Sequence, residues 1–263
     1  MRDVTMVSDF GVGVDVGSTT TKAVMVDHSG KVIASHLMMT GGTAANSASK
    51  CVEEITRKAS VSPSDISIVS TGYGRAQVDG ATQRITEITC HSIGVYHLNP
   101  QIAFLIDVGG QDSKVIRIGK NGRPQDFEIN DKCSAGTGRF LEVMSRVLEK
   151  SLSELSSLAL ESTSPSTISS TCTVFAESEV IGRIGSGDSV QDIAAGIHLS
   201  MASKIATLSR RVGVIEPVCV TGGVALNPAF RFYLSKQLGF ELWVPSEPQL
   251  TGALGAAVLA LQD

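Results

Sequence analysis

Apolar residues recur along the chain with two different spacings. In some segments they form the short runs typical of strands, and in others they return every three or four residues, as in a helix. Short β-branched runs at 12–14, 23–26 and 31–39 predict the first three strands. Polar and apolar positions over 44–59 have a helical spacing, and an apolar stripe returns every three or four residues over 190–212. This alternation of strands and helices is typical of α/β proteins.

The same patterns predict the remaining elements. Further strands are expected at 66–70, 103–106, 115–118, 217–221 and 241–244, and further helices at 88–98, at 138–148, after Cys172, from Pro228 onwards and at 252–261. The Ser/Thr-rich segment 151–170 carries regularly spaced leucines, which favour a short helix and a turn over a linker.

One sequence pattern occurs twice. Asp15–Lys22 reads D-V-G-S-T-T-T-K, and Asp107–Lys114 reads D-V-G-G-Q-D-S-K. Each copy follows a short apolar run and leads into a β-branched run, so each predicts strand, glycine-rich turn and strand. Because each copy stands at the head of about half the chain, we predict a duplicated α/β domain, with a first domain over 1–100 and a second over 101–263.

Composition narrows the class of protein. The chain has 263 residues, of which 42% are hydrophobic and 18% charged, and its formal charge is −4, so a packed core is expected and disorder is not. The absence of a basic block argues against nucleic acid, and the absence of an apolar run of about 20 residues argues against a membrane span. Met1–Phe10 lacks a signal-peptide pattern, so a cytoplasmic location is expected.

The two repeated turns have the chemistry of a phosphate site. Glycine-rich turns expose backbone N–H groups, and an aspartate before the turn can hold Mg²⁺ through water. Asp15 and Asp107 have this position, and Gln111 is a further candidate for orienting water. The candidate phosphate-binding residues are Gly17, Ser18, Thr19, Thr20, Thr21, Lys22, Gly109, Gly110, Gln111 and Asp112. A single such turn is more often an ordinary hairpin, but the chain has two copies and no P-loop or dinucleotide fingerprint.

A third glycine-rich turn makes the pattern more specific. Thr221-Gly222-Gly223-Val224-Ala225 follows a predicted strand, and together the three turns resemble the nucleotide-binding signature of the actin, Hsp70 and sugar-kinase superfamily. The resemblance implies two ribonuclease-H-like domains with ATP in the cleft between them. It also implies that Gly222, Gly223 and Gln249 meet the adenosine, although an exposed loop position for Gln249 is an equal alternative.

Five cysteines, an odd number, argue against a disulfide framework. Cys133 and Cys172 lie in polar, Gly/Thr-rich segments ahead of predicted helices, where a thiolate is stabilised. Cys51, Cys90 and Cys219 are interpreted as buried structural residues. Two ligands cannot complete a four-cysteine cluster or a zinc site, so a cluster would need two cysteines from each of two chains, as a symmetric dimer provides.

The longest motifs resemble one family. Asn130-Asp131-Lys132-Cys133 with the following Gly-Thr-Gly-Arg-Phe, and Cys172-Thr173-Val174-Phe175-Ala176-Glu177, are similar to segments of the activator ATPases (component A) of 2-hydroxyacyl-CoA dehydratases. That family includes ATPase subunits of benzoyl-CoA reductase. The resemblance implies a homodimer that shares one [4Fe-4S] cluster, with Cys133 and Cys172 as ligands in each chain.

The resemblance also implies what the protein does. ATP hydrolysis would drive one low-potential electron from the cluster to an iron–sulfur dehydratase or reductase, and ferredoxin or flavodoxin would supply electrons. Three alternatives stay open: an ATPase subunit of a ring reductase or an activator of another double-cluster protein, a small-molecule kinase of the same fold, and an actin-like filament or scaffold. The kinase leaves Cys133 and Cys172 without a role, and the filament or scaffold predicts an open head-to-tail assembly and no metal.

Overall fold

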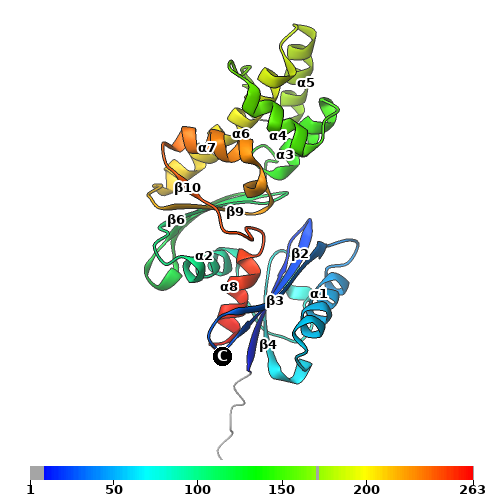
Figure 1. The fold of residues 1–263 in the computed structure, drawn as a ribbon, viewed down its shortest axis with the longest axis vertical. Coiled ribbons are helices and arrows are strands. Elements are labelled where there is room, and N and C mark those ends of the chain that lie inside the picture. Colours follow the sequence, from blue (N-terminus) through cyan, green and yellow to red (C-terminus); the bar gives the residue numbers. More distant parts are fainter. Residues whose placement is uncertain (1–8, 170–171, 263) are drawn as a thin grey trace, which may run out of the picture. The chain divides into compact units, whose positions relative to one another are not determined.

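The computed structural model describes residues 9–169 and 172–262, and Figure 1 shows the path of the chain. Residues 1–8, where the sequence predicts no signal peptide, and Ser170 and Thr171 of the second cysteine motif lie outside the described residues. The chain divides into two compact units. The first unit contains residues 9–101, 118–124 and 249–262, and the second contains residues 102–117 and 125–248.

The first unit is built on a five-stranded sheet with strand order β3-β2-β1-β4-β5. Its strands are β1 (Phe10–Val16), β2 (Thr20–Asp27), β3 (Val32–Met39), β4 (Ile66–Thr71) and β5 (Ala81–Arg84). Strand β1 pairs antiparallel with β2 and parallel with β4, so the turn after β1 and the end of β4 meet at the same edge.

Three helices cover the two faces of this sheet, as Figure 1 shows for α1 and α8. Helix α1 (Ala44–Ala59) packs on one face, and α2 (Glu87–Leu98) and α8 (Thr251–Ala260) pack on the other. Alternate side chains of a strand point to opposite faces. Ala23 and Met25 of β2 therefore join the core beneath α1, and Val24 and Val26 pack with α8.

The second unit repeats this topology in a sheet with strand order β10-β9-β6-β7-β8. Its strands are β6 (Phe104–Val108), β7 (Ser113–Ile118), β8 (Pro124–Asn130), β9 (Val218–Thr221) and β10 (Leu242–Trp243). Strand β6 pairs antiparallel with β7 and parallel with β9, as β1 does with β2 and β4. The equal strand orders confirm the duplicated α/β fold predicted from the repeated turns.

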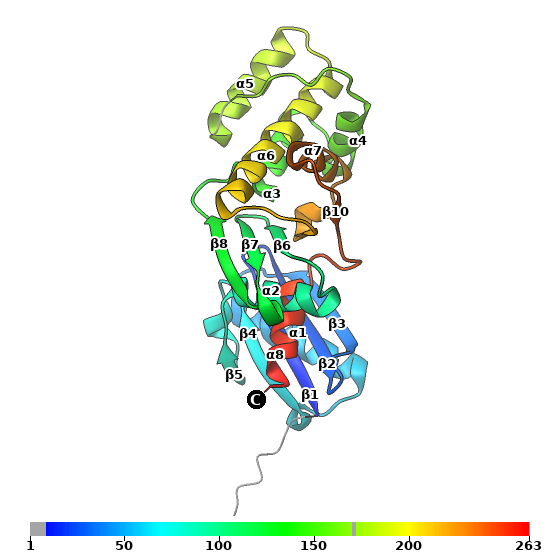
Figure 2. The same cartoon turned by 90° about the vertical axis from the view of Figure 1, so that its left-hand side faces the viewer.

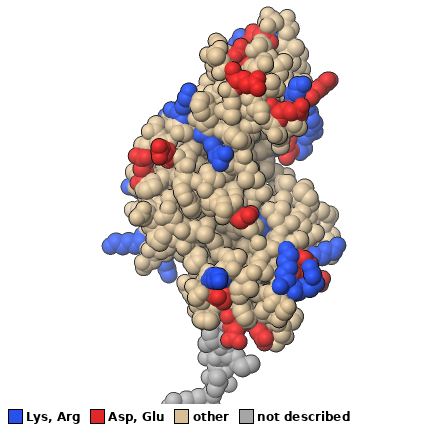
Figure 3. Space-filling view, in the orientation of Figure 1, with Lys and Arg blue, Asp and Glu red and all other residues tan. Residues whose placement is uncertain are grey.

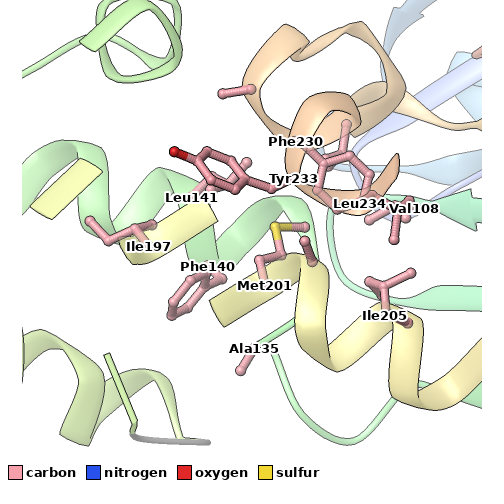
Figure 4. Close-up of a cluster of buried hydrophobic side chains, with 14 of the residues drawn as sticks. Val108, Ala135, Phe140, Leu141, Ile197, Met201, Ile205, Phe230, Tyr233 and Leu234 are labelled. Atoms are coloured by element: carbon pink, nitrogen blue, oxygen red, sulfur yellow. The ribbon is translucent and has the colours of Figure 1, made fainter. Parts of the chain in front are cut away.

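The helices of the second unit build its core. They are α3 (Gly138–Val147), α4 (Leu152–Glu161), α5 (Thr173–Gly185), α6 (Val190–Val212) and α7 (Pro228–Leu238). Figure 2 shows β6, β7 and β8 side by side. In Figure 4, Met201 and Ile205 of α6, Phe140 of α3 and Phe230 of α7 lie in one buried cluster with Val108 of β6. This core holds α3 and α6 in fixed positions above the sheet.

The structure differs from the sequence-based expectation in two respects. The expected second domain ran to residue 263, but residues 249–262 pack with the first unit, because Ala253, Leu254 and Ala257 of α8 bury their side chains against β2. Strands β5 and β8 were not expected, because most of their residues are polar or partly exposed and lack the apolar alternation of a buried strand.

Within residues 9–169 and 172–262, no helix combines the length and the hydropathy that crossing a bilayer requires.

Candidate functional site

The turn between β1 and β2 holds a buried aspartate beside a lysine. Asp15 faces Lys22 across the two strands, and the Lys22 ammonium lies 3.2 Å from Asp15 Oδ2. The Gly17 N–H donates to the Thr20 carbonyl at 3.0 Å and closes the turn. The ion pair and the closed turn hold the buried carboxylate in a fixed orientation, as a group that acts on Mg²⁺ or water requires.

The turn between β6 and β7 has the same construction. Asp107 faces Lys114, whose ammonium lies 3.5 Å from Asp107 Oδ2 and 2.7 Å from Asp112 Oδ2. The Gly109 N–H donates to the Asp112 carbonyl at 3.0 Å, as Gly17 does to Thr20 in the first turn. The second copy thus has one carboxylate more than the first.

Each aspartate is enclosed by a glycine from the neighbouring parallel strand. Gly72 follows β4 with a φ of +91°, and Gly222 follows β9 with a φ of +84°. A Cβ atom at Gly72 would lie 2.7 Å from Asp15 Oδ1, and one at Gly222 would lie 3.0 Å from Asp107 Oδ1. Only glycine fits at both positions, because φ is positive and the carboxylates approach closely. Thr221 adds a hydrogen bond of 2.9 Å to Asp107 Oδ1.

The other residues predicted to bind phosphate differ in exposure. Ser18 and Gln111 are exposed at the tips of the two turns, and Thr19 is partly exposed. Thr21 is buried instead, and its hydroxyl lies 3.1 Å from the Thr40 hydroxyl. The Thr21 side chain therefore anchors the turn from inside the first unit.

The residues predicted to meet adenosine are divided between the two units. Gly222 and Gly223 belong to the second unit, where the Gly222 N–H donates to the Pro248 carbonyl at 2.9 Å. Gln249 is partly buried and belongs to the first unit, immediately ahead of α8.

A buried histidine lies behind Asp15. His91 of α2 places Nδ1 3.0 Å from the Thr251 hydroxyl at the start of α8. A Cβ atom at Gly252 would lie 2.9 Å from His91 Nε2 and 3.2 Å from Asp15 Oδ2, so these two atoms face the same small space. The sequence alone predicted no role for His91.

The two candidate cluster cysteines lie in adjacent turns of the second unit. Cys172 is exposed and is the N-cap of α5, whereas Cys133 is partly buried and precedes α3 by several residues. The Ser134 hydroxyl lies 2.7 Å from the Thr173 hydroxyl, so the residues that follow the two cysteines touch each other. The structure therefore brings the two cysteine-bearing segments, which are far apart in the sequence, into contact.

A lysine contacts the first of these thiols. The Lys204 ammonium on α6 donates to Cys133 Sγ at 3.0 Å. Burial raises the pKa of the Cys133 thiol, but hydrogen bonds from Lys204 and from the Ala135 backbone lower it, and the net pKa lies below the usual value. Cys133 is thus prepared to act as a thiolate ligand.

The remaining cysteines have a different environment. Cys51, Cys90 and Cys219 are buried, and burial raises the pKa of Cys51 to about 11 and that of Cys90 to about 12. The pKa of Cys219 is raised for the same reason. These thiols stay protonated at neutral pH, as the structural role predicted for them requires.

Two backbone hydrogen bonds connect the second phosphate turn to the helix after Cys133. The Gly138 N–H donates to the Gly109 carbonyl at 2.8 Å, and the Arg139 N–H donates to the Gly110 carbonyl at 2.9 Å. The first amides of α3 are therefore bound to the turn, whereas the sequence-based argument for the cysteines assumed free N–H groups at helix N-termini. A displacement of the turn would be transmitted directly to α3.

In the parts of the chain that the structure describes, three or more His, Cys, Asp or Glu side chains nowhere converge as a metal site would require. Two thiols in adjacent turns form half of a four-thiolate set, so the donor chemistry fits a cluster completed by a second chain. On the face shown in Figure 3, basic and acidic side chains are interspersed.

Sequence reasoning missed four contributors to these sites. The sequence contains a signal for two of them. Lys114 lies seven residues after Asp107, as Lys22 does after Asp15. The pair Thr71-Gly72 stands at the end of β4, as Thr221-Gly222 does at the end of β9. His91 and Lys204 gave no comparable signal, because each reaches its site through packing between segments far apart in the sequence.

Comparison with known proteins places these features in one family. The model of the BadF/BadG/BcrA/BcrD ATPase family matches residues 12–260. The chain is 42% identical over 255 residues to the 2-hydroxyisocaproyl-CoA dehydratase activator of Clostridioides difficile, covering 97% of this chain and 96% of that protein. The structure of that activator with bound ADPNP matches with a TM-score of 0.89, at 42% identity, over 96% of this chain and 94% of the other.

Two further relatives agree with this assignment. The (R)-2-hydroxyglutaryl-CoA dehydratase activating ATPase of Acidaminococcus fermentans is 42% identical over 96% of this chain and 97% of that protein. Its crystal structure, described as component A, matches with a TM-score of 0.92, at 41% identity, over 97% of this chain and 98% of the other. A subunit of the benzoyl-CoA reductase of Thauera aromatica is 30% identical over 78% of this chain and 74% of that protein.

Proposed function

The chain belongs to the BadF/BadG/BcrA/BcrD ATPase family, and we propose that this ATPase drives one low-potential electron from a [4Fe-4S] cluster, shared by two copies of the chain, to an iron–sulfur dehydratase or reductase. The names of the dehydratase activators among its relatives support a role as an activator. The subunit of benzoyl-CoA reductase supports a second candidate, an ATPase subunit of a reductase of that type. A cytoplasmic location and a ferredoxin or flavodoxin as donor belong to this proposal.

The nucleotide part of the proposal rests on the two equivalent turns. Asp15 and Asp107 would hold Mg²⁺ through water, and the exposed Gln111 would orient the attacking water. Bound Mg²⁺ neutralises developing charge on the phosphates. The turns at 17–22 and 109–112 would bind phosphate oxygens through groups other than the Gly17 and Gly109 N–H groups, which close the turns. Gly222, Gly223 and Gln249 would lie at the adenosine. Lys22 and Lys114 form ion pairs with the two aspartates and would add positive charge beside the phosphates.

The redox part rests on the pair of cysteines. Cys133 and Cys172 would supply two thiolates, and a second copy of the chain would supply two more about a two-fold axis. Such a cluster supplies one-electron redox chemistry. The exposed Cys172 and the partly buried Cys133 would place it at the surface, where a partner protein can approach.

The observation that carries the coupling is the connection between Gly109–Gly110 and Gly138–Arg139. The turn proposed to sense the terminal phosphate is bound by two hydrogen bonds to α3, whose preceding loop contains Cys133. Hydrolysis changes the charge that the turn binds, and a packed helix responds as a rigid body. The same turn would therefore report the nucleotide state to the cluster ligand.

Iron analysis and an anaerobic ultraviolet–visible spectrum test the proposal on the wild type, Cys133→Ser and the matched control Cys51→Ser. We expect a broad band near roughly 400 nm, bleached by dithionite, with about one cluster per dimer in the wild type and the control, and its loss in Cys133→Ser. If the wild type binds no iron after anaerobic reconstitution, the electron-transfer proposal fails and an ATPase of this fold remains.

A further inference from the structure

The ammonium of Lys204 contacts the sulfur of Cys133. Neither the proposed ATPase site nor the proposed cluster ligation explains this contact. The lysine lies on α6, and its Nζ donates to Cys133 Sγ at 3.0 Å. Among residues 9–169 and 172–262, no carboxylate forms an ion pair with Lys204. The field of a lysine ammonium without a carboxylate partner acts chiefly on the group that it contacts.

Both partners of this contact are held in place. Met201 and Ile205, on either side of Lys204 in α6, are buried in the core shown in Figure 4. On the other side, the Asn130 amide donates to the carbonyls of Cys133 at 2.9 Å and of Ala135 at 3.2 Å, which fixes the loop that carries the thiol. The ammonium–sulfur distance is therefore determined by packed structure on both sides.

The loop also leaves a path for the lysine side chain. Lys204 Cδ would lie 3.4 Å from a Cβ atom placed at Gly136, so the aliphatic stem runs beside this glycine before the ammonium reaches the sulfur. Gly136 has a φ of +93°. The stem is thus confined, and the loss of rotamer freedom that weakens exposed lysine contacts has already occurred on folding.

We propose that Lys204 is a positioning residue that sets the reduction potential of the cluster, by holding a positive charge on one of its sulfur ligands. This inference rests on the proposed function. Reduction adds one negative charge to the cluster, and a nearby ammonium that donates to a ligand sulfur stabilises the reduced state more than the oxidised state. Lys204 therefore raises the potential, and in a symmetric dimer each Cys133 has its own Lys204.

The contact also makes the two ligands of one chain unequal. Cys172 is exposed at the N-cap of α5, whereas Cys133 is partly buried and receives the hydrogen bond from Lys204. Electron density in the reduced cluster would be favoured beside the two Cys133 sulfurs. A donor protein would then reduce the cluster more easily, and Lys204 determines how easily.

An anaerobic redox titration followed by electron paramagnetic resonance tests this inference on the reconstituted dimer. Lys204→Met removes the charge, Lys204→Arg keeps it, and Lys150→Met is the matched control, since Lys150 is an exposed lysine just beyond α3. We expect Lys204→Met to raise the ratio of oxidised to reduced cluster at a fixed potential about tenfold, which is a potential lower by about 59 mV for one electron. Lys204→Arg and Lys150→Met should titrate close to the wild type.

An unchanged potential in Lys204→Met with an intact cluster overturns the inference, and a wild type without a cluster overturns the proposed function instead. If Lys204→Met assembles no cluster, Lys204→Gln replaces it as the neutral variant. Loss of the cluster in both neutral variants but not in Lys204→Arg supports a requirement for the charge. Loss in Lys204→Arg as well would show that only the shape of the lysine matters, and would also overturn the inference.

Discussion

The hydroxyls of Ser134 and Thr173 lie 2.7 Å apart and connect the two cysteine turns of the second unit. Each residue directly follows a cysteine, Cys133 in one case and Cys172 in the other. This hydrogen bond joins two segments that are 39 positions apart along the chain. The two cysteine-bearing segments are thus held together within one chain.

Removing this hydrogen bond should loosen the cluster. A hydrogen bond contributes about 1 kcal/mol, so we expect the cluster of Ser134→Ala to be lost to a chelator about fivefold faster than that of the wild type. The measurement is the decay of visible absorption under anaerobic conditions. Ser186→Ala is the matched control, because the Ser186 hydroxyl only donates to the Gly182 carbonyl at the far end of α5. Equal decay of the two variants would contradict the role given to Ser134.

Gly138→Ala should separate ATP hydrolysis from electron transfer. A Cβ atom at Gly138 would lie 3.2 Å from the Gly109 carbonyl oxygen and 3.3 Å from Gly110 Cα, so the helix would be pushed away from the turn. Overpacking of this kind costs about 1–3 kcal/mol. We expect more ATP hydrolysed per electron delivered, measured as phosphate release against acceptor reduction.

The control for this variant is Gly185→Ala. Gly185 also lies in a helix, α5, but a Cβ atom there would have no neighbour within 4 Å. Its ratio of ATP to electrons should equal that of the wild type. A wild-type ratio in Gly138→Ala would show that the two hydrogen bonds do not carry the coupling.

The two halves of the duplication should respond alike to loss of their aspartates. We expect Asp15→Asn and Asp107→Asn each to lower the turnover number for ATP by about 100-fold or more, because in the proposed site each carboxylate helps to hold the Mg²⁺ that neutralises charge on the phosphates. Steady-state phosphate release measures this effect, and Asp126→Asn, an exposed change on β8, is the control. Retention of full activity in either variant would remove that aspartate from the site.

The buried cysteines should not react with alkylating reagents in the folded protein. The raised pKa values of Cys51, about 11, and Cys90, about 12, keep both thiols neutral at about pH 8, so iron-free protein should be alkylated at the exposed Cys172 and not at these two. Peptide mass mapping after iodoacetamide treatment reads out each site. Alkylation of Cys51 at the rate of Cys172 would mean that the core around α1 opens readily.

The raised pKa values of the buried thiols also make the free energy of unfolding depend on pH. A thiol whose pKa is raised by folding stabilises the folded state fully below its unfolded pKa, and this contribution is lost as the pH rises through the folded pKa. The unfolded thiols titrate near 9.0, so the free energy of unfolding should fall as the pH rises from there towards about 11. Urea unfolding across this range checks the sign.

Local patterns predicted the helices α1 and α6 with their observed bounds, because both ends are encoded nearby. The Ser189 hydroxyl accepts from the Asp192 N–H at the start of α6, and Gly213 ends that helix with a left-handed conformation. The repeated turns were likewise predicted, since the aspartate, the glycines and the lysine recur at equal spacing.

The parts that could not be predicted depend on contacts between distant segments. The pairing of His91 with Thr251 joins α2 to α8, and the contact of Lys204 with Cys133 joins α6 to the loop before α3. Nothing in the local pattern around a lysine on a helix indicates that its ammonium reaches a sulfur 71 positions away. The strand β8 was not predicted for another reason, because its exposed polar residues lack an apolar face.

The position of α8 has a consequence for synthesis of the chain. Strands β1 and β2 leave the ribosome early, but the helix that covers Val24 and Val26 is made from residues near the other end of the chain. Until that helix emerges, Val24 and Val26 lack their cover, and uncovered apolar positions on a sheet are prone to association. The nascent chain should therefore need shielding by a chaperone until α8 is translated.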